Sequence, residues 1–442
     1  MEWLQSALVV VAVVAALVLS VAMAEAAPPD VPEAEKALLN TVDAWGLPFS
    51  DQLIRFTRHF ADAPEAPFAL GVTHDLVKVW PTKYWFRGRT VAAGQPTETM
   101  PQLWAAAGET QAFQVAVLPR MGAAEASYQI TVEATGAEVE TYREVFVTTS
   151  KAAAYPRFSS DRWPDPLVLG EEATAGGVDC CVFWVDVHIP ATATGTLECK
   201  VAVSDGTTTA GATIPIRVVS GLDLDPKAYP FIGWFQRHKM TPEQYREHCA
   251  LVLSHHMFPV DALKGQWDPN DPSKFDDLRA YLESKGQRLF EVDRPGSKEF
   301  DSLYAHLKEK GWLPSTVAYS NQDEPDDATF VKDNIPFMQM VRDKYPGLKV
   351  YLASDWHENM QDGCDAWMTD LSSSGYDPEK HKTLQAPELW HYYCHLPVRF
   401  QMRAPLVDAP NMQIDNPALE HRLALWMSRY FGAKVVFIWA GN

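Results

Sequence analysis

Four acidic residues gather within five positions in the C-terminal half of the sequence, in the run Asp323-Glu324-Pro325-Asp326-Asp327. Asp326 and Asp327 follow a proline, where acidic side chains commonly cap a helix and interact with its positive end. Asp323 and Glu324 precede the proline and follow an apolar segment, a position that helix capping does not explain. We therefore predict that Asp323 and Glu324 are the catalytic residues.

Two neighbouring carboxylates repel each other, so at least one of them is expected to stay protonated near neutral pH. A protonated carboxyl group can deliver a proton to a glycosidic oxygen. An ordinary retaining glycosidase has a second carboxylate about 5 Å away as nucleophile. We expect that nucleophile at the end of the seventh strand described below, but residues 390–395 contain no acid. A 2-acetamido group of the substrate could attack instead, with Asp323 polarising its N–H; a carboxylate from another loop is the alternative.

The elements that would position this pair alternate strictly between strand and helix after Asp223. Helix signals separate the apolar segments, for example the capping box of Thr241 and Gln244. Eight alternations predict a parallel (β/α)8 barrel, and an open doubly wound sheet is disfavoured because no nucleotide-binding glycine motif follows a strand. Active sites of such barrels lie at the C-terminal ends of the strands. The predicted strands are 231–235, 257–261, 288–292, 316–320, 349–353, 366–369, 388–393 and 434–439.

The sequence before this barrel has another periodicity. Short alternating segments separated by turn residues predict an antiparallel β-sandwich over residues 71–222. It has no catalytic constellation, so we interpret it as a support domain. Residues 25–70 are interpreted as a helical accessory segment, and the barrel covers residues 223–442. Because the sequence stops at Asn442, directly after the eighth strand, the last helix of the barrel is expected to be missing.

The first 24 residues predict export. An almost unbroken Ala, Val and Leu run from Ala7 ends in Ala22-Met23-Ala24, which has the small-x-small pattern of a signal-peptide cleavage site. No positive charge precedes the run, so an uncleaved membrane anchor is the alternative. In both cases the remaining chain is predicted to be periplasmic or extracellular.

Composition limits the partners. The 442 residues carry a formal net charge of −19, which argues against binding nucleic acid or anionic membrane surfaces and favours a neutral or cationic substrate. No CxxC or HExxH motif occurs, so neither a metal site nor a cofactor is predicted. The six cysteines have no disulfide-framework spacing, which leaves disulfides and buried free thiols equally open. An oligomer is also left open.

Several segments together resemble glycoside hydrolase family 123, the β-N-acetylgalactosaminidases, and related catalytic domains without an assigned function. The similar segments are 108–114, 163–167, 184–187, 323–325, 390–397 and 414–442. The resemblance implies a β-sandwich before a barrel, and substrate-assisted, retaining hydrolysis of N-acetylhexosamine-containing glycans. By resemblance, Asp323 stabilises the intermediate, Glu324 is the acid/base, Tyr392 binds the acetamide carbonyl and Trp439 belongs to the sugar platform.

Three alternatives accompany this interpretation. A β-N-acetylglucosaminidase or another hexosaminidase is one, and a catalytically inactive exported sugar-binding protein is another. Family 20 hexosaminidases also use an adjacent Asp-Glu pair, but their preceding His-x-Gly-Gly is absent, and Asn321-Gln322 stands there.

Sugar rings pack on aromatic faces, although aromatic residues at strand ends also close barrels. The predicted substrate-binding residues are Asn321, Tyr392, Trp439, Trp367, Trp390 and Trp234.

Overall fold

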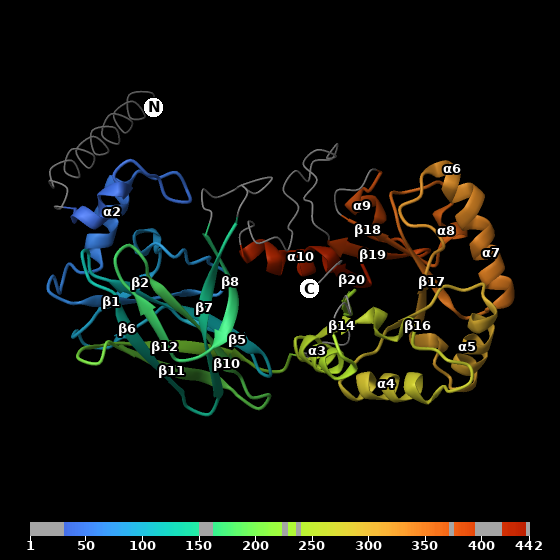
Figure 1. Cartoon of the computed structure of the whole chain (residues 1–442), viewed down its shortest axis with the longest axis horizontal. Helices are drawn as coiled ribbons and strands as arrows, with labels where there is room; N and C mark the ends of the chain where they lie inside the picture. The colour runs from blue at the N-terminus through green and yellow to red at the C-terminus, as the bar shows by residue number, and fades with distance from the viewer. Residues whose placement is uncertain are drawn as a thin grey trace, which may run out of the picture. The chain divides into compact units, whose positions relative to one another are not determined.

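The computed structural model describes residues 31–149, 162–222, 229–235, 240–370, 375–393 and 418–438. The chain divides into two compact units, Met1–Leu222 and Asp223–Asn442 (Figure 1). The predicted export signal and Trp439 lie outside the described residues. Within the described ranges, we find no helix with the length and apolar character needed to cross a bilayer.

The first unit contains two six-stranded sheets. The first has the strand order β2-β1-β5-β10-β7-β8. The second has the order β3-β12-β11-β6-β9, and its sixth strand, β4, also pairs with β12. Side chains from both sheets form a single hydrophobic core, with Val115 of β5 and Ile214 of β12 fully buried in it. Most pairings are antiparallel, as predicted, but β3 and β4 run parallel to β12. The strands are β1 (Phe68–His74), β2 (Arg89–Ala92), β3 (Glu98–Thr99), β4 (Leu103–Ala106), β5 (Thr110–Pro119), β6 (Ala126–Ala134), β7 (Glu138–Thr148), β8 (Arg162–Leu169), β9 (Glu172–Ala175), β10 (Cys181–His188), β11 (Gly195–Ser204) and β12 (Thr209–Val219).

The N-terminal segment of this unit is part of its core and not an accessory. It contains η1 (Glu33–Leu38) and α2 (Phe49–Arg58), and Phe49, Leu53 and Phe56 of α2 are buried against the sheets. The Glu35 carboxylate of η1 is buried as well, and Lys83 Nζ donates to it at 3.1 Å. Burying one charge alone would be costly, so this ion pair ties η1 to the sandwich.

The second unit is built on an eight-stranded parallel sheet with the order β14-β13-β20-β19-β18-β17-β16-β15, which is nearly closed. All eight predicted strands are present, and the prediction of a parallel barrel-like sheet is confirmed. At the seam between its two ends, Gln287 Nε2 donates to the Pro259 carbonyl at 3.2 Å. The strands are β13 (Phe231–Gly233), β14 (Met257–Pro259), β15 (Phe290–Val292), β16 (Thr316–Tyr319), β17 (Lys349–Ala353), β18 (Ala366–Thr369), β19 (Glu388–Tyr393) and β20 (Val435–Ile438).

The helices of this unit are less regular than a (β/α)8 pattern. After β17 and β18 the described connections contain only single-turn helices, α8 (Met360–Gly363) and α9 (Pro378–His381). Both segments are rich in polar residues and lack the apolar spacing of a longer helix. The other helices are η3 (Val260–Leu263), α3 (Pro242–Ser254), α4 (Ser273–Ser284), α5 (Lys298–Glu309), η4 (Leu313–Ser315), the continuous run α6 (Asp327–Thr329), η5 (Phe330–Asn334, a π-helical turn) and α7 (Ile335–Lys344), and α10 (Ala418–Tyr430).

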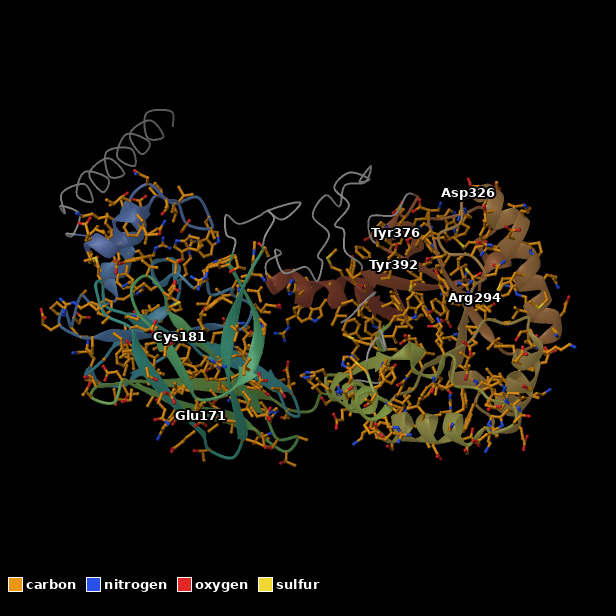
Figure 2. All side chains as sticks on the ribbon, in the orientation of Figure 1. Glu171, Cys181, Arg294, Asp326, Tyr376 and Tyr392 are labelled. Atoms are coloured by element: carbon orange, nitrogen blue, oxygen red, sulfur yellow. The ribbon has the colours of Figure 1, made fainter. Side chains whose placement is uncertain are left out.

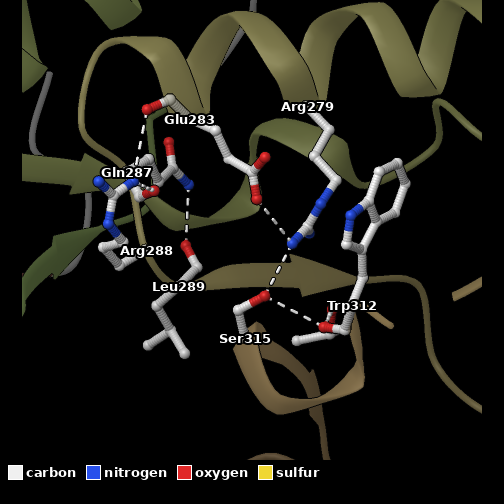
Figure 3. Close-up of polar contacts among 8 residues, drawn as sticks. Arg279, Glu283, Gln287, Arg288, Leu289, Trp312 and Ser315 are labelled. Carbon is white, nitrogen blue, oxygen red and sulfur yellow. Dashed lines mark hydrogen bonds and ion pairs between the residues drawn. The ribbon is translucent and has the colours of Figure 1, made fainter. Parts of the chain in front are cut away.

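A buried arginine fastens α4 to the strands β15 and β16. The Arg279 guanidinium is fully buried and donates to Glu283 at 3.1 Å and to Ser315 Oγ at 2.7 Å (Figure 3). It also lies over the rings of Trp312 and of Phe290 in β15, 4.4 and 4.0 Å from their centroids. Burial lowers the pKa of Arg279 to about 10, which still leaves it charged at neutral pH. The network fixes the third and fourth strands, which carry the residues of the site described next.

The five cysteines within the described ranges are free and buried: Cys180, Cys181, Cys199, Cys249 and Cys364. Burial raises the pKa of the Cys181 and Cys199 thiols to about 12, so both are protonated and unreactive at neutral pH. Cys394 lies outside the described residues. Of the two alternatives that the sequence leaves open, these five positions follow the buried-thiol one.

Candidate active site

Asp323 and Glu324 lie in the loop that follows β16, at the C-terminal edge of the parallel sheet, and both are exposed. The acids beyond the proline have a different role. Asp326 caps α6 by accepting a hydrogen bond from the Thr329 N–H at 2.7 Å, and Asp327 contacts His357 Nδ1 at 2.6 Å. The acids after Pro325 therefore bond to α6 and to His357, whereas the acids before it lie at the edge of the sheet, as their positions around the proline suggest.

Asp323 is held by a tyrosine of the strand that precedes it. The Tyr319 hydroxyl, on a ring buried at the end of β16, donates to the Asp323 carboxylate. Burial raises the pKa of Tyr319 above its ordinary value, and the bond to Asp323 adds to the rise. Tyr319 thus remains protonated and acts as a donor, which fixes one oxygen of Asp323.

Glu324 is held by a tyrosine from another strand. The Tyr392 hydroxyl of β19 donates to Glu324 Oε1 at 3.1 Å, although β17 and β18 separate the two strands in the sheet. This bond spans part of the barrel mouth. Figure 2 shows Tyr392, Arg294 and Asp326 on the same unit of the chain.

The backbone of Glu324 is in an unusual conformation. Its φ of 44° lies in the left-handed region, which a residue with a long side chain seldom adopts. Such a conformation costs about 1–3 kcal/mol and is found mainly at functional sites. The Glu324 N–H donates to the Ala353 carbonyl at the end of β17 at 3.0 Å, so neighbouring structure maintains it.

A π-helical turn, η5, is hydrogen-bonded to the loop that carries Asp323 and Glu324. Within η5, the buried Asn334 amide donates to Ser320 Oγ at 2.9 Å, and the Asp333 carbonyl accepts from the Asn321 amide at 3.2 Å. Arg294 donates to the Asn321 carbonyl at 3.1 Å. Asn321, predicted to bind substrate, therefore uses its side-chain N–H to fix the loop. Single π-turns inside helices frequently occur at functional sites.

A second polar cluster occupies the first three strands of the mouth. Glu291 on β15 is fully buried; Trp234 Nε1 donates to it at 2.6 Å and Lys264 Nζ at 2.9 Å. Half-buried Asp261, which follows β14, accepts from the Phe235 N–H at 3.3 Å. Burial raises the pKa of Asp261 to about 6. The sequence signal for Glu291 is a single acid inside an apolar strand, and it belongs to no catalytic motif.

This cluster adjoins the loop of Asp323 and Glu324 through aromatic rings. Trp234, one of the predicted substrate-binding residues, packs edge-on against Tyr319 with ring centroids 5.5 Å apart. It also packs edge-on against Phe437 of β20 at 5.2 Å. Trp234 is half-buried, and Lys264 Nζ lies 4.8 Å from the centroid of its ring.

Two of the predicted substrate-binding residues, Trp367 and Trp390, are buried. Trp367 is completely buried and aligns with Leu352 and Leu389 on the outer face of the sheet, so it belongs to the core under the helices and not to the rim. Trp390 is only 1% exposed and stacks on Tyr351 inside the barrel, with ring centroids 5.0 Å apart. Neither ring is accessible to a sugar, because neighbouring side chains bury both of them.

No protein-family model matches the sequence, and no curated protein matches it. Among solved structures, the chain is similar to a family 123 glycoside hydrolase from Clostridium perfringens, described for its hydrolysis of glycolipid glycans. The TM-score is 0.58 at 12% sequence identity, and the alignment covers 84% of this chain and 78% of that one. This likeness shows a shared fold.

Two further structures align more weakly. A putative β-galactosidase from Bacteroides fragilis gives a TM-score of 0.30 at 9% identity, covering 76% of this chain and 53% of that chain. A β-glucuronidase from Bacteroides uniformis gives 0.28 at 9% identity, covering 84% and 45%. At these TM-scores, neither structure supports a conclusion about the fold or the site of this chain.

Proposed function

We propose that this protein is a retaining exo-glycoside hydrolase that removes terminal β-linked N-acetylgalactosamine by substrate-assisted catalysis. The observation that carries the proposal is the adjacent pair Asp323 and Glu324 at the C-terminal edge of the barrel sheet, each fixed by a tyrosine hydroxyl from a different strand. Two fixed carboxylates at a barrel mouth suit proton transfer and charge stabilisation. The fold shared with a family 123 glycoside hydrolase supports the same class of reaction.

In the proposed first step, Glu324 transfers its proton to the glycosidic oxygen while the acetamide carbonyl oxygen of the substrate attacks the anomeric carbon. The bond to the leaving group breaks, and an oxazolinium ion forms. Asp323 accepts a hydrogen bond from the acetamide N–H, which orients the carbonyl and stabilises the positive charge. Tyr319 supports this role by fixing the other side of Asp323.

In the second step, the Glu324 carboxylate removes a proton from water, and the water oxygen attacks the anomeric carbon and opens the oxazolinium ring. Two inversions at the same carbon give net retention of configuration. The Tyr392 hydroxyl, 3.1 Å from Glu324, keeps the carboxylate directed toward the mouth between the two steps. A role for Tyr392 in binding the acetamide carbonyl would require its hydroxyl to leave Glu324 when substrate enters.

Hydrolysis of a chromogenic N-acetyl-β-galactosaminide, measured beside the corresponding glucosaminide, tests the proposal. We expect turnover of the galactosaminide with retention of configuration in the first product released. Turnover of the glucosaminide alone would assign the other hexosamine. Absence of turnover with both substrates, together with retained sugar binding, would support the inactive sugar-binding alternative.

A further inference from the structure

The buried carboxylate of Glu291 and its partners have no part in the two steps above. Glu291 is 0% exposed, whereas the Lys264 side chain that pairs with it at 2.9 Å is 36% exposed. Lys264 therefore reaches from a buried anion to the surface of the mouth. Lys264 Nζ also lies 4.8 Å from the centroid of the Trp234 ring.

The ion pair between Lys264 and Glu291 also has a structural role. Glu291 lies on β15, at one end of the eight-stranded sheet, and Lys264 follows β14 and η3 at the other end, so their ion pair bridges the seam. However, a buried ion pair seldom stabilises a fold more than apolar side chains of the same size would. The seam also has neutral contacts, since Gln287 bonds Pro259 across it at 3.2 Å.

The geometry of the pair fits a polyol ligand. An ammonium group has three donors, and among the described residues Glu291 is the hydrogen-bond acceptor for Lys264. The remaining donors can bond hydroxyl oxygens, while a half-buried indole beside them offers an apolar face for the C–H groups of a sugar ring. Trp234 packs against Tyr319, which holds Asp323, so a sugar that contacts Asp323 lies next to this cluster.

We propose that Lys264, held by Glu291 and backed by Trp234, is a hydroxyl-binding subsite for the terminal hexosamine and determines which hexosamine is accepted. The inference rests on the proposed function and deepens it. Hexosamines that differ in the orientation of one hydroxyl would then be discriminated by whether that hydroxyl reaches Lys264. A site built to hydrogen-bond a hydroxyl strongly rejects an analogue without it, because its own polar groups are left unpaired.

The test is a cycle of protein and ligand variants. The 3-, 4- and 6-deoxy analogues of N-acetylgalactosamine and the parent sugar are titrated by calorimetry into the wild type and into Lys264→Met. We expect Lys264→Met to weaken binding of the parent about 10- to 100-fold, as for a lost hydrogen bond to a charged group. For at least one deoxy analogue the two proteins should bind with nearly equal affinity, because the contact is already absent.

Matched variants separate this result from general damage. Lys349→Met removes a similarly exposed lysine at the beginning of β17, 39% exposed and 2.7 Å from Glu388, although Glu388 is itself 36% exposed and not buried like Glu291; this variant should leave sugar binding unchanged. The double variant Lys264→Met/Glu291→Gln avoids an unpaired buried charge if the single variant folds poorly. It should show the same loss of discrimination.

Equal losses in Lys264→Met for the parent and all three deoxy sugars would overturn the inference, as would a fall in thermal midpoint with unchanged affinities. Binding of none of these sugars to the wild type would overturn it as well. By contrast, wild-type binding with normal discrimination but no hydrolysis of any hexosaminide would contradict the proposed hydrolase function and leave the subsite supported.

Discussion

Asp323 and Glu324 are neighbours in sequence, yet hydroxyl groups from two different strands hold their carboxylates. This arrangement gives adjacent acids different surroundings: Asp323 is bonded to a buried tyrosine of the strand that precedes it, and Glu324 to a half-buried tyrosine across the sheet. Different environments let two similar groups take different roles. The sequence alone predicts a catalytic pair from its position before Pro325, but it does not predict the tyrosine partners, because those contacts depend on which strands meet in space.

Glu324→Gln tests the proton donor. The amide cannot protonate a leaving group, so kcat/KM should fall about 10²- to 10⁴-fold for an alkyl glycoside. The loss should be much smaller for an aryl glycoside, because a nitrophenolate departs with little protonation. Steady-state rates with both substrates measure this. Equal losses for the two leaving groups would remove Glu324 from the acid role.

Tyr319→Phe tests whether Asp323 needs its hydroxyl partner. The ring is kept, so packing against Trp234 should persist, while Asp323 loses one anchor and kcat/KM should fall about 10-fold with alkyl and aryl substrates alike. Tyr304→Phe is a matched control, since that hydroxyl bonds the Pro346 carbonyl at 2.8 Å, away from the site. Similar activity in both variants would show that Tyr319 does not position Asp323.

At the scale of elements, strand positions could be predicted because apolar segments alternate with helix signals. The face that each strand residue occupies could not, because parallel strands covered on both sides are apolar on both faces. Trp367 and Met368 are neighbours on β18, and only the register shows that Trp367 points outward and Met368 inward. The place of Glu291 in the site could not be predicted for a related reason: an acid inside an apolar strand indicates a site only once the direction of its side chain is known.

Trp367→Ala follows from that register. Removing a fully buried indole should lower the free energy of unfolding by about 3–5 kcal/mol, as large-to-small changes in cores do. The folded fraction should keep the wild-type KM, because the ring lies outside the barrel. Urea unfolding and steady-state kinetics measure the two effects. A raised KM with unchanged stability would return Trp367 to the substrate pocket.

β19 and α10 share a buried polar network with a pH-dependent consequence. His391 is fully buried between the Tyr376 hydroxyl, 2.7 Å from Nε2, and Ser428 Oγ, 3.1 Å from Nδ1. Burial lowers the pKa of His391 to about 3, so it stays neutral in the folded protein. The unfolded chain takes up a proton near pH 6.5, and stability therefore falls as the pH drops below that value, by at most about 1.4 kcal/mol per pH unit.

His391→Gln should be less stable than the wild type at pH 7, but the difference should shrink between pH 6.5 and pH 4. Comparing the two proteins cancels other groups, including Asp261, whose pKa of about 6 acts in the opposite direction. Urea unfolding at a series of pH values gives the comparison. A constant difference across this range would mean that His391 is not buried in its neutral form.

At the scale of the whole molecule, the change in periodicity near residue 222 marks the boundary between the two compact units. The eight-stranded sheet brings residues from five separate segments of the sequence to one edge: Trp234, Lys264, Glu291, the Tyr319–Asp323–Glu324 segment and Tyr392. The sandwich carries none of them. The proposed catalysis therefore depends on the barrel unit, where we propose that the substrate's acetamide group is the nucleophile and that Asp323 positions it.

Inhibition by a thiazoline analogue of the oxazolinium ion distinguishes this nucleophile from a protein side chain. We expect strong inhibition of the wild type and at least 100-fold weaker inhibition of Asp323→Asn, because the bound ring loses the carboxylate that stabilises its charge. Asp323→Asn should also be impaired with aryl leaving groups, unlike Glu324→Gln. Failure of the thiazoline to inhibit the wild type, together with covalent trapping of a side chain by a 2-fluoro sugar, would contradict the substrate-assisted mechanism and identify a protein nucleophile.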